Sequence, residues 1–385
     1  MLFGLASHRP LFLVVDDLQW ADELSLGFLA TLDPAELAQR GVLVLCTYRM
    51  EEMGEELRKL VQAPGIRQFE IGRLDKENVR SMVSGMLALR TPPAEFVDVL
   101  ERQSEGNPFF IAEYLRAAIE ARLLHRNTAG EWVLRESAGS LDTLDLPRSL
   151  AEIMDRRLLG LEESTRGLVQ LAAVLGREFD LELLLRAAAL EDPTAMEALE
   201  TLRIRQILEQ PTGGRLRFVH DKLRESFYRQ IPAEQTPSLH SRAATAIEQQ
   251  YAGTRTLEQY FPNLGHHWSR AGVRDRAIDY LTRAGDRARA AYANNEALSL
   301  YAAAVTEVRG ALEAGGALAR WRDSLCHLHE SQGDVQVLLG KHEEARASFA
   351  ESLSWANEDR GRRSRLHRKI GKSWETHHRH DEALR

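Results

Sequence analysis

The sequence is poor in cysteine and contains neither a long apolar run nor an excess of glycine or proline. Its 385 residues include only two cysteines, Cys46 and Cys326. This number excludes a disulfide framework and fits a reducing compartment. No apolar stretch approaches the roughly 20 residues that a membrane span needs, and the first ten residues lack the basic segment of a signal peptide. We therefore expect a cytoplasmic globular protein without membrane contact.

An excess of basic residues is also absent. Lys and Arg number 50 against 57 Asp and Glu, so the net charge is −7 and the pI about 6.0. This balance disfavours a general nucleic-acid binder, so DNA is not an expected partner. A chain of this length is too long for one ordinary domain, and two or three are expected.

Metal-binding and nucleophile patterns do not stand out. The histidines at 266, 267, 377, 378 and 380 lack the cysteine or carboxylate spacing of a metal site. We interpret them as solvated helix ends. No Ser/His/Asp or Cys/His arrangement stands out either.

A phosphate-binding loop is missing as well. The nearest match to Gly-x-x-x-x-Gly-Lys-Ser/Thr is Gly371-Lys372-Ser373, but Leu366 stands at the first glycine position in a basic, helical stretch. The loop would precede the first apolar strand, yet only ten residues do so. We expect the phosphate-binding half to be missing from this sequence, or the gene model to begin too late.

That first strand, Leu11–Val15, is a continuous apolar run closed by Asp16 and Asp17. Such a run predicts a parallel-sheet strand buried on both faces. Carboxylates at its carboxyl end lie where open α/β sheets bind ligands. Two adjacent acids repel each other, and Mg²⁺ bound to phosphates would offset this repulsion.

The segment Val14 to Asp22 resembles the Walker B segment of the STAND-type signalling ATPases, the AAA-like ATPases of large bacterial regulators. The resemblance implies that Asp16 holds Mg²⁺ through water and that Asp17 polarises the attacking water. The alternative is a buried strand followed by a loop rich in acids and helix caps.

A second apolar run, Val42–Cys46, ends in Thr47-Tyr48-Arg49 after a helical pattern capped by Asp22. It resembles the sensor 1 strand of the same family. The resemblance places Thr47 at the nucleotide and Arg49 on the γ-phosphate, where a planar guanidinium suits phosphate oxygens. The alternative is a solvated arginine at a strand end.

We expect a short strand at Arg67–Ile71 and helices from Asp75. The third segment that resembles this family follows them. Asn107 and Pro108 predict a capped helix start. The sequence Gly-Asn-Pro-Phe-Phe is similar to the lid of this family, and the similarity implies that Pro108 lines the adenine pocket.

The middle of the chain predicts a hairpin at Leu124–Arg135, a helix from Pro147, three short helices and two strands, Ile207–Gln210 and Leu216–Val219. Three helices with a β-wing are typical of a winged helix. A DNA-reading role is disfavoured because acidic residues interrupt the surface. Val219-His220-Asp221 is similar to the Met-His-Asp of related switch ATPases, which implies that His220 contacts the β-phosphate of ADP. The alternative is a structural histidine.

The last third resembles tetratricopeptide repeats. An alanine precedes a large apolar residue by four positions at Ala277/Leu281, Ala297/Tyr301 and Ala345/Phe349, and a fourth unit begins near Asp381. The small residue would let helices approach closely while the large one fills the gap. The irregular spacing and the end at Arg385 suggest degenerate repeats and a truncated last unit.

The expected fold is therefore an α/β partial P-loop NTPase module followed by mainly α winged-helix-like and helical-repeat regions. The predicted domains are a nucleotide-binding core at 1–72, a helical lid with hairpin at 73–146, a winged-helix-like domain at 147–236 and repeats at 237–385.

The predicted function is that of a fragment of an ATP/ADP-switched signalling ATPase with Mg²⁺ as cofactor. Its effector, a kinase, cyclase or DNA-binding domain, lies outside the chain. The repeats would bind protein partners, and self-association on activation is a further expectation. This chain alone should be inactive because it lacks the phosphate loop. The alternative is a non-enzymatic scaffold with an ATPase remnant and protein-binding repeats.

Overall fold

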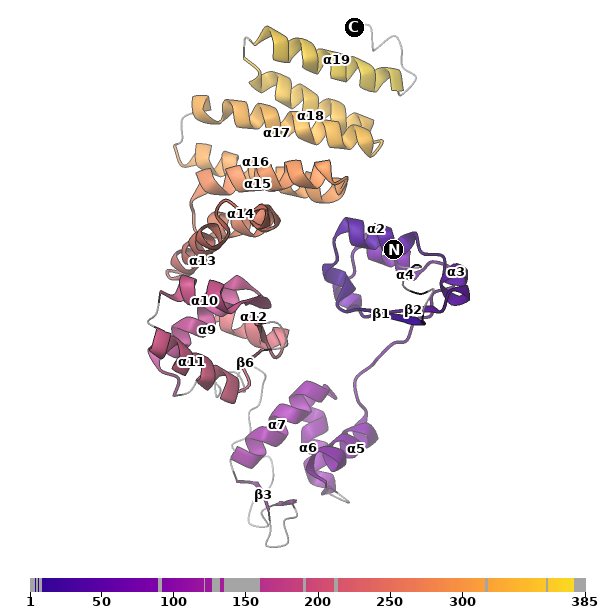
Figure 1. Cartoon of the computed structure of the whole chain (residues 1–385), viewed down its shortest axis with the longest axis vertical. Coiled ribbons are helices and arrows are strands. Elements are labelled where there is room, and N and C mark those ends of the chain that lie inside the picture. Colours follow the sequence, from indigo (N-terminus) through magenta and orange to yellow (C-terminus); the bar gives the residue numbers. More distant parts are fainter. Residues whose placement is uncertain are drawn as a thin grey trace. The chain divides into compact units, whose positions relative to one another are not determined.

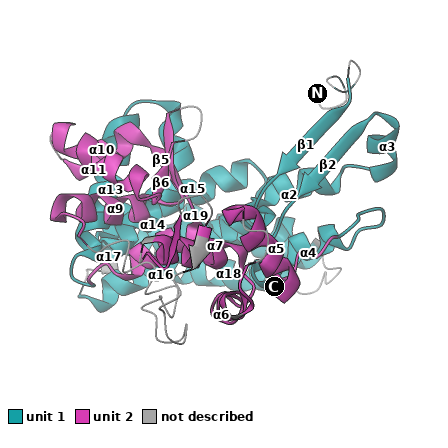
Figure 2. Cartoon of the chain, turned by 90° about the horizontal axis from the view of Figure 1, so that it is seen from below, with its two compact units in different colours: residues 1–68, 233–385 teal, residues 69–232 magenta. Residues whose placement is uncertain are grey.

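The computed structural model describes residues 4, 6, 9–88, 92–120, 122–126, 132–134, 160–189, 192–210, 214–315, 318–357 and 359–376. Most of them are helical and few lie in strands (Figure 1). Two compact units are present, residues 1–68 with 233–385, and residues 69–232 (Figure 2). The predicted division into four domains stays a prediction. In the described ranges, no helix has both the length and the apolar character needed to cross a membrane.

The first part of unit 1 is a small α/β element. Strands β1 (Leu11–Val15) and β2 (Val42–Cys46) pair in parallel. Asp22 caps the helix that follows β1, because its Oδ1 accepts from the Ser25 N–H at 2.7 Å, as predicted. The remaining elements are η1 (Leu18–Trp20), α2 (Glu23–Ala30), α3 (Pro34–Gln39), η2 (Met50–Glu52) and α4 (Glu55–Val61).

The predicted burial of β1 on both faces is wrong. Val15 and Cys46 pack in a cluster built on Leu18, Leu57 and Val61, which α2 and α4 complete. On the other face Phe12 is 58% exposed and Leu43 is 63% exposed. An apolar run is typical of a strand with a helical layer on each face. Here the described helices cover one face only, so the residues alternate between partial burial and exposure.

The strand expected at Arg67–Ile71 is also wrong. The described residues show no strand there, and Phe69 and Ile71 are 83% and 95% exposed. An extended segment needs a paired neighbour to form a sheet. This stretch instead crosses the boundary between the two units.

Unit 2 begins with three helices, α5 (Lys76–Leu87), α6 (Ala94–Ser104) and α7 (Pro108–Glu120). They share an apolar core in which Val79, Phe96 and Ile111 are fully buried. The predicted hairpin is confirmed as β3 (Leu124–Arg126) paired antiparallel with β4 (Trp132–Leu134). Its turn and the helix predicted from Pro147 lie outside the described residues.

The second part of unit 2 contains the predicted three helices, here α9 (Glu163–Leu175), α10 (Leu181–Ala188) and α11 (Asp192–Ile204). The two predicted strands are confirmed as β6 (Leu208–Glu209) and β7 (Arg215–Phe218). A third strand, β5 (Glu178–Asp180), pairs with β7 and completes a sheet of order β5-β7-β6. The sequence pattern does not predict β5, because Glu-Phe-Asp contains a single apolar residue. Helix α12 (Asp221–Arg229) follows.

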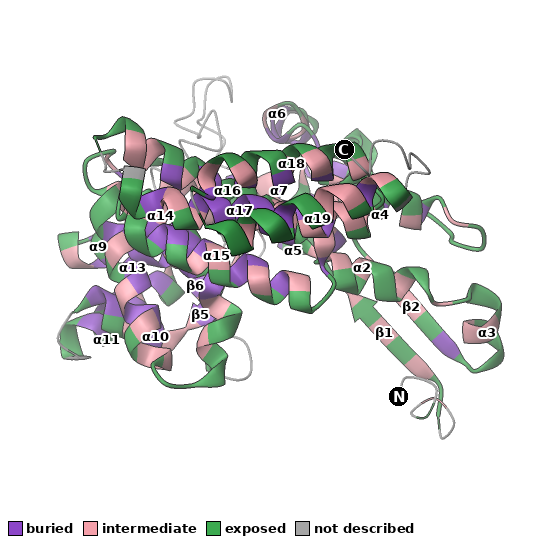
Figure 3. Cartoon of the chain, turned by 90° about the horizontal axis from the view of Figure 1, so that it is seen from above, coloured by how far each residue is buried: buried purple, intermediate pink, exposed green. Residues whose placement is uncertain are grey.

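The rest of unit 1 is a stack of helices in sequence order (Figure 1). Buried residues run along the helix contacts from α14 to α17 while the outward surfaces are exposed (Figure 3). The expected all-helical pattern is confirmed, and the unit expected near Asp381 lies outside the described residues. The helices are α13 (Thr236–Tyr251), η4 (Arg255–Tyr260), α14 (Phe261–Arg270), α15 (Arg274–Ala290), α16 (Asn294–Glu313), α17 (Leu318–Leu338), α18 (His342–Trp355) and α19 (Arg360–Thr376).

Three glycines in this stack lie against a large side chain of the next helix. A Cβ placed on Gly285 would lie 2.6 Å from the ring of Tyr301, and one on Gly333 would lie 2.4 Å from the ring of Phe349. A Cβ on Gly265 would lie 2.7 Å from the Leu281 side chain. Each glycine precedes its partner by sixteen residues. The repeat pattern predicts the gap-filling residues but not the glycines that they contact.

Candidate functional site

Four of the predicted site residues follow the two parallel strands. In the register of the sheet Val15 lies opposite Cys46, so Asp16 and Thr47 leave the same edge. The backbone extends this pairing past the strands, because the Thr47 N–H donates to the Val15 carbonyl at 3.0 Å and the Leu18 N–H to the Thr47 carbonyl at 2.8 Å. The carboxyl ends of both strands are therefore fixed against each other.

The Thr47 hydroxyl joins the two acids. It donates to Asp16 Oδ1 in a short hydrogen bond and accepts the Asp17 N–H at 2.9 Å. Asp17 has a left-handed backbone, with φ 58° and ψ 50°. Non-glycine residues seldom adopt this region, although aspartate tolerates it better than most. The bond to Thr47 helps to hold Asp17 in this conformation.

Arg49 lies beside Asp17. Its Nε is 4.0 Å from Asp17 Oδ1, and its Nη1 is 3.4 Å from Glu52 Oε1. The Arg49 side chain is 34% exposed and that of Asp17 is 19% exposed, so the pair is a partly solvated one. Such pairs contribute little to stability, about 0–1 kcal/mol. The guanidinium therefore stays near the surface, within reach of an anionic ligand.

Gln19 is the residue of this edge whose role the sequence analysis missed. Its Nε2 donates to Asp17 Oδ1 at 3.0 Å, and its Oε1 accepts the Arg49 N–H at 3.2 Å. One side-chain amide thus bridges the two strand ends. The only signal in the sequence was its place within the Walker B-like segment.

Pro108 and its neighbours form a tight turn in unit 2. Asn107 Oδ1 accepts the Phe109 N–H at 3.0 Å, so Asn107 caps α7 and Pro108 begins it, as predicted. Gly106 has φ +71°, and a Cβ there would lie 2.2 Å from the Leu74 carbonyl oxygen. Only glycine fits this approach, because the obstacle is backbone.

His220, the last predicted site residue, also lies in unit 2. It precedes α12 at the N-cap position without a side-chain cap bond. Its ring contacts that of Phe109, with centroids 3.9 Å apart and planes inclined by 54°. A second contact joins the same regions, because Arg116 of α7 donates to Gln206 in a short hydrogen bond. The structure therefore brings the Pro108 turn and His220 together.

The six predicted site residues divide between the two units. Asp16, Asp17, Thr47 and Arg49 gather at one edge of unit 1, whereas Pro108 and His220 gather in unit 2. Each group is local and well defined. Their roles toward a nucleotide stay predictions.

Two buried histidines, His240 of α13 and His267 of α14, lie against each other, and the exposed His266 lies beside them. His240 Nδ1 and His267 Nδ1 are 2.9 Å apart, and the His266 ring is 5.6 Å from that of His240. Burial, followed by the nearby His266 and Arg270, lowers the pKa of His240 to about 4. Burial, followed by His240 and His266, lowers the pKa of His267 to about 3.

The interpretation as solvated helix ends is therefore wrong for His267, which is 3% exposed. His266 is exposed but lies in the middle of α14. The histidines at 377, 378 and 380 lie outside the described residues. His267 was misread because it falls on the inner side of α14. No group of three or more metal-ligand side chains is suitably placed in the described ranges.

Comparison with known proteins shows a weak structural similarity and no match to a family model or a curated protein. Among solved structures, the chain is similar to the Signal Transduction ATPase with Numerous Domains (STAND) protein with a tetratricopeptide repeat sensor from Pyrococcus horikoshii. The match has 11% identity and a TM-score of 0.40, and it covers 97% of this chain.

The chain spans 66% of the length of that structure's chain. A TM-score of 0.40 is too low to carry an argument about this protein. The residues and their contacts remain the basis for function.

Proposed function

We propose that this chain carries part of an ATP/ADP-switched signalling ATPase. One observation supports the proposal most: two parallel strands end side by side with Asp16, Asp17, Thr47 and Arg49 linked across the sheet edge. In this proposal Asp16 would hold Mg²⁺ through water, Asp17 would polarise the attacking water and Arg49 would neutralise the γ-phosphate.

The donor set fits a magnesium ion. Asp16, Asp17 and the Thr47 hydroxyl are hard oxygen donors, which Mg²⁺ prefers. No third acidic or histidine ligand joins them within the described part of the chain. Mg²⁺ commonly takes one or two carboxylates and completes its shell with water and phosphate oxygens, so a set of this size suffices. Bound Mg²⁺ would supply charge neutralisation for the phosphates.

Unit 2 and the helical stack complete the proposal. Pro108 would contact the adenine, and His220 would bind the β-phosphate of ADP. The region around α9–α11 would be a winged-helix-like connector. Two arginines near the end of α11 are already engaged, since Arg203 pairs with Glu200 at 2.9 Å and Arg205 donates to the Gly160 carbonyl at 3.3 Å. DNA binding is therefore not proposed for this region. The helical stack would bind a protein partner.

The second candidate is a non-enzymatic scaffold. The absence of a phosphate loop from the 385 residues favours it, because the backbone amides and the lysine of that loop hold the phosphates.

Reading the genomic sequence upstream of codon 1 decides between the two. An in-frame strand followed by Gly-x-x-x-x-Gly-Lys-Ser/Thr is the result expected for the switch. An in-frame stop codon directly before Met1 would contradict the switch and favour the scaffold.

A further inference from the structure

Helix α19 is strongly basic in an acidic protein. Its 17 residues, Arg360–Thr376, contain seven Lys and Arg and one Glu, a net charge of +6, whereas the whole chain carries −7. Like charges on one helix repel and destabilise it unless they are compensated. The structure shows that only part of this charge is compensated.

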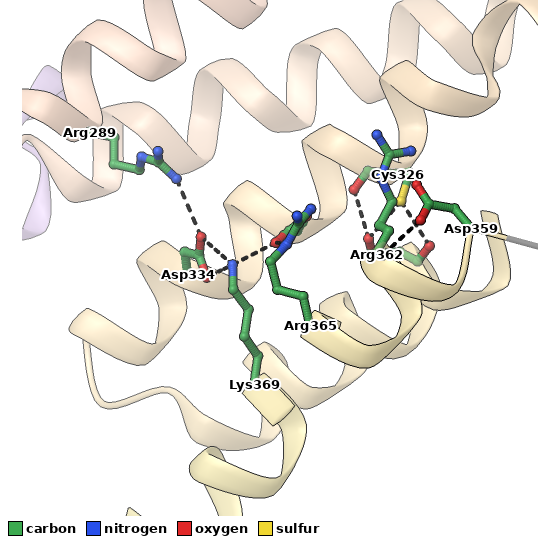
Figure 4. A network of polar contacts seen from close by, with 9 residues as sticks. Arg289, Cys326, Asp334, Asp359, Arg362, Arg365 and Lys369 are labelled. Carbon is green, nitrogen blue, oxygen red and sulfur yellow. Dashed lines mark hydrogen bonds and ion pairs between the residues drawn. The ribbon is translucent and has the colours of Figure 1, made fainter. Parts of the chain in front are cut away.

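Three basic residues of α19 face α17 and pair with its acids (Figure 4). Arg362, Arg365 and Lys369 recur at spacings of three and four, so they share one face of α19. Arg362 contacts Asp323 at 2.8 Å, and Arg365 donates two bonds of 2.8 Å to Glu330. Lys369 contacts Glu330 at 2.7 Å and Asp334 at 2.6 Å.

These inward contacts serve the fold. Burial opposes ionisation of Glu330, but the hydrogen bonds from Arg365 and Lys369 lower its pKa to about 2. Asp334 also receives Arg289 of α15, whose Nη1 lies 3.5 Å away (Figure 4). The acids of α17 are thus occupied by cations from α15 and α19.

Three further arginines lie on the outward side of α19. Arg360, Arg363 and Arg368 are exposed, and none of them makes a side-chain hydrogen bond or ion pair with another described residue. They contribute nothing to holding α19 on α18, which Leu366 and Ile370 do through the apolar cluster around Phe349. Their positive charge is therefore available to a ligand.

We propose that the outward face of α19, built on Arg360, Arg363 and Arg368, docks an acidic protein segment. We choose an acidic partner because its negative charge complements the positive charge of this face. Arginine presents a planar fork that pairs carboxylates with two bonds, and three of them along one helix match acidic side chains on an opposing segment.

The surroundings disfavour a nucleic acid. Affinity for duplex DNA rests on neutralising a series of phosphates, roughly six to ten in typical binders, whereas this face is built on three arginines. Single strands also need aromatic side chains for base stacking. The one tryptophan of α19, Trp374, is already covered by the Arg346 guanidinium at 3.6 Å.

The test measures binding of the full chain to a fluorescein-labelled, glutamate-rich helical peptide by fluorescence anisotropy. A peptide of the same sequence with Gln in place of Glu is the ligand control. We expect binding to the first peptide only, weakening steeply with salt.

The decisive variant is Arg360→Glu/Arg363→Glu/Arg368→Glu. Its matched control, Arg58→Glu/Arg166→Glu/Arg255→Glu, makes the same charge change at exposed arginines elsewhere. We expect the first triple to weaken peptide binding by about tenfold or more, and the second by less than about twofold. Circular dichroism and thermal unfolding show whether both variants stay folded.

Several results would overturn the proposal. These are no binding of the Glu peptide at low salt, equal binding of the Gln peptide, or equal weakening by both triples. Tighter binding of duplex DNA that the first triple abolishes would assign the face to nucleic acid. Salt-dependent dimerisation lost in the first triple, seen by sedimentation, would assign it to a second copy. Peptide binding needs no nucleotide, so the result is independent of the proposed ATPase.

Discussion

The left-handed backbone of Asp17 allows two substitutions to distinguish the effect of its charge from the effect of its conformation. With φ at 58°, it lies in a region that asparagine also tolerates but alanine does not favour. Asp17→Asn therefore removes the negative charge without adding strain. Asp17→Ala removes the charge and adds a backbone cost on the order of 1 kcal/mol.

In a form of the protein that hydrolyses ATP, Asp17→Asn should abolish hydrolysis while nucleotide stays bound, because Asp16 still supports Mg²⁺. Phosphate release and equilibrium binding of a fluorescent nucleotide measure the two effects. The unfolding temperature of Asp17→Asn should match the wild type, and that of Asp17→Ala should be lower. Hydrolysis at the wild-type rate by Asp17→Asn would show that the role assigned to Asp17 is wrong.

Two substitutions at His220 distinguish the packing of its ring from its proposed hydrogen bond to ADP. The ring contact with Phe109 at 3.9 Å is structural, whereas the proposed bond to ADP needs an imidazole N–H. His220→Phe keeps an aromatic ring but loses the donor, and His220→Ala loses both. We expect His220→Phe to weaken ADP binding by about tenfold or more relative to ATP binding, the effect of one charge-assisted hydrogen bond. Circular dichroism shows whether the variant stays folded. Equal weakening of both nucleotides in a well-folded His220→Phe would instead identify a histidine of purely structural importance.

At the scale of elements, the glycines of the helical stack offer a direct test of packing. Gly285→Ala and Gly333→Ala would place a methyl group 2.6 Å and 2.4 Å from aromatic ring atoms. Overpacking of this kind costs about 1–3 kcal/mol. Both variants should therefore unfold at lower denaturant concentration.

The matched control is Gly167→Ala, in the middle of α9, where a Cβ meets nothing within 4 Å. Here the substitution should stabilise the protein by about 0.5–1 kcal/mol, the usual difference between glycine and alanine in a helix. A stabilising effect at Gly285 as well would mean that α15 and α16 do not approach as closely as described.

The contact between α13 and α14 makes the stack sensitive to acid. His240 and His267 are neutral in the folded protein, with pKa values of about 4 and about 3, whereas an unfolded histidine titrates near 6.5. Between pH 6.5 and about 4 the unfolded chain binds more protons, so the free energy of unfolding falls as the pH falls. Thermal unfolding across this window should show the decrease.

A His240→Gln/His267→Gln variant should have a flatter profile between pH 6.5 and 4.5. The window ends there because carboxylates with lowered pKa values, such as Glu330, begin to destabilise the fold at lower pH. Equal slopes in the variant and the wild type would contradict this origin of the acid sensitivity.

Helix caps and helix periodicity were the most predictable features among the elements. The local signals are the caps Asp22 and Asn107 and the four-residue spacing of Ala277 and Leu281. The structure confirms the helices that they predict. The exposed face of β1, the missing strand at Arg67–Ile71 and the sixteen-residue glycine contacts depend on which elements pack together. That information is not local, so the sequence pattern alone could not supply it. The bridge made by Gln19 was missed for the same reason.

At the scale of the whole molecule, nucleotide affinity is the property that most needs measuring. The chain has acids and an arginine at one sheet edge but no phosphate loop in its 385 residues. Because the loop supplies most phosphate contacts, we expect the chain alone to bind ATP poorly. Titration with a fluorescent ATP analogue tests this, and micromolar affinity dependent on Mg²⁺ would refute it.

Helix α15 takes part in two of the glycine contacts. Its Leu281 packs against Gly265 of α14, and its Gly285 packs against Tyr301 of α16. The pair α14–α15 and the pair α15–α16 therefore share helix α15. An engineer who wished to shorten or lengthen the array could not remove or insert α15 with only one neighbour, because the other neighbour would lose its counterpart. Any exchange that separates α15 from α14 or from α16 therefore breaks one of these two contacts.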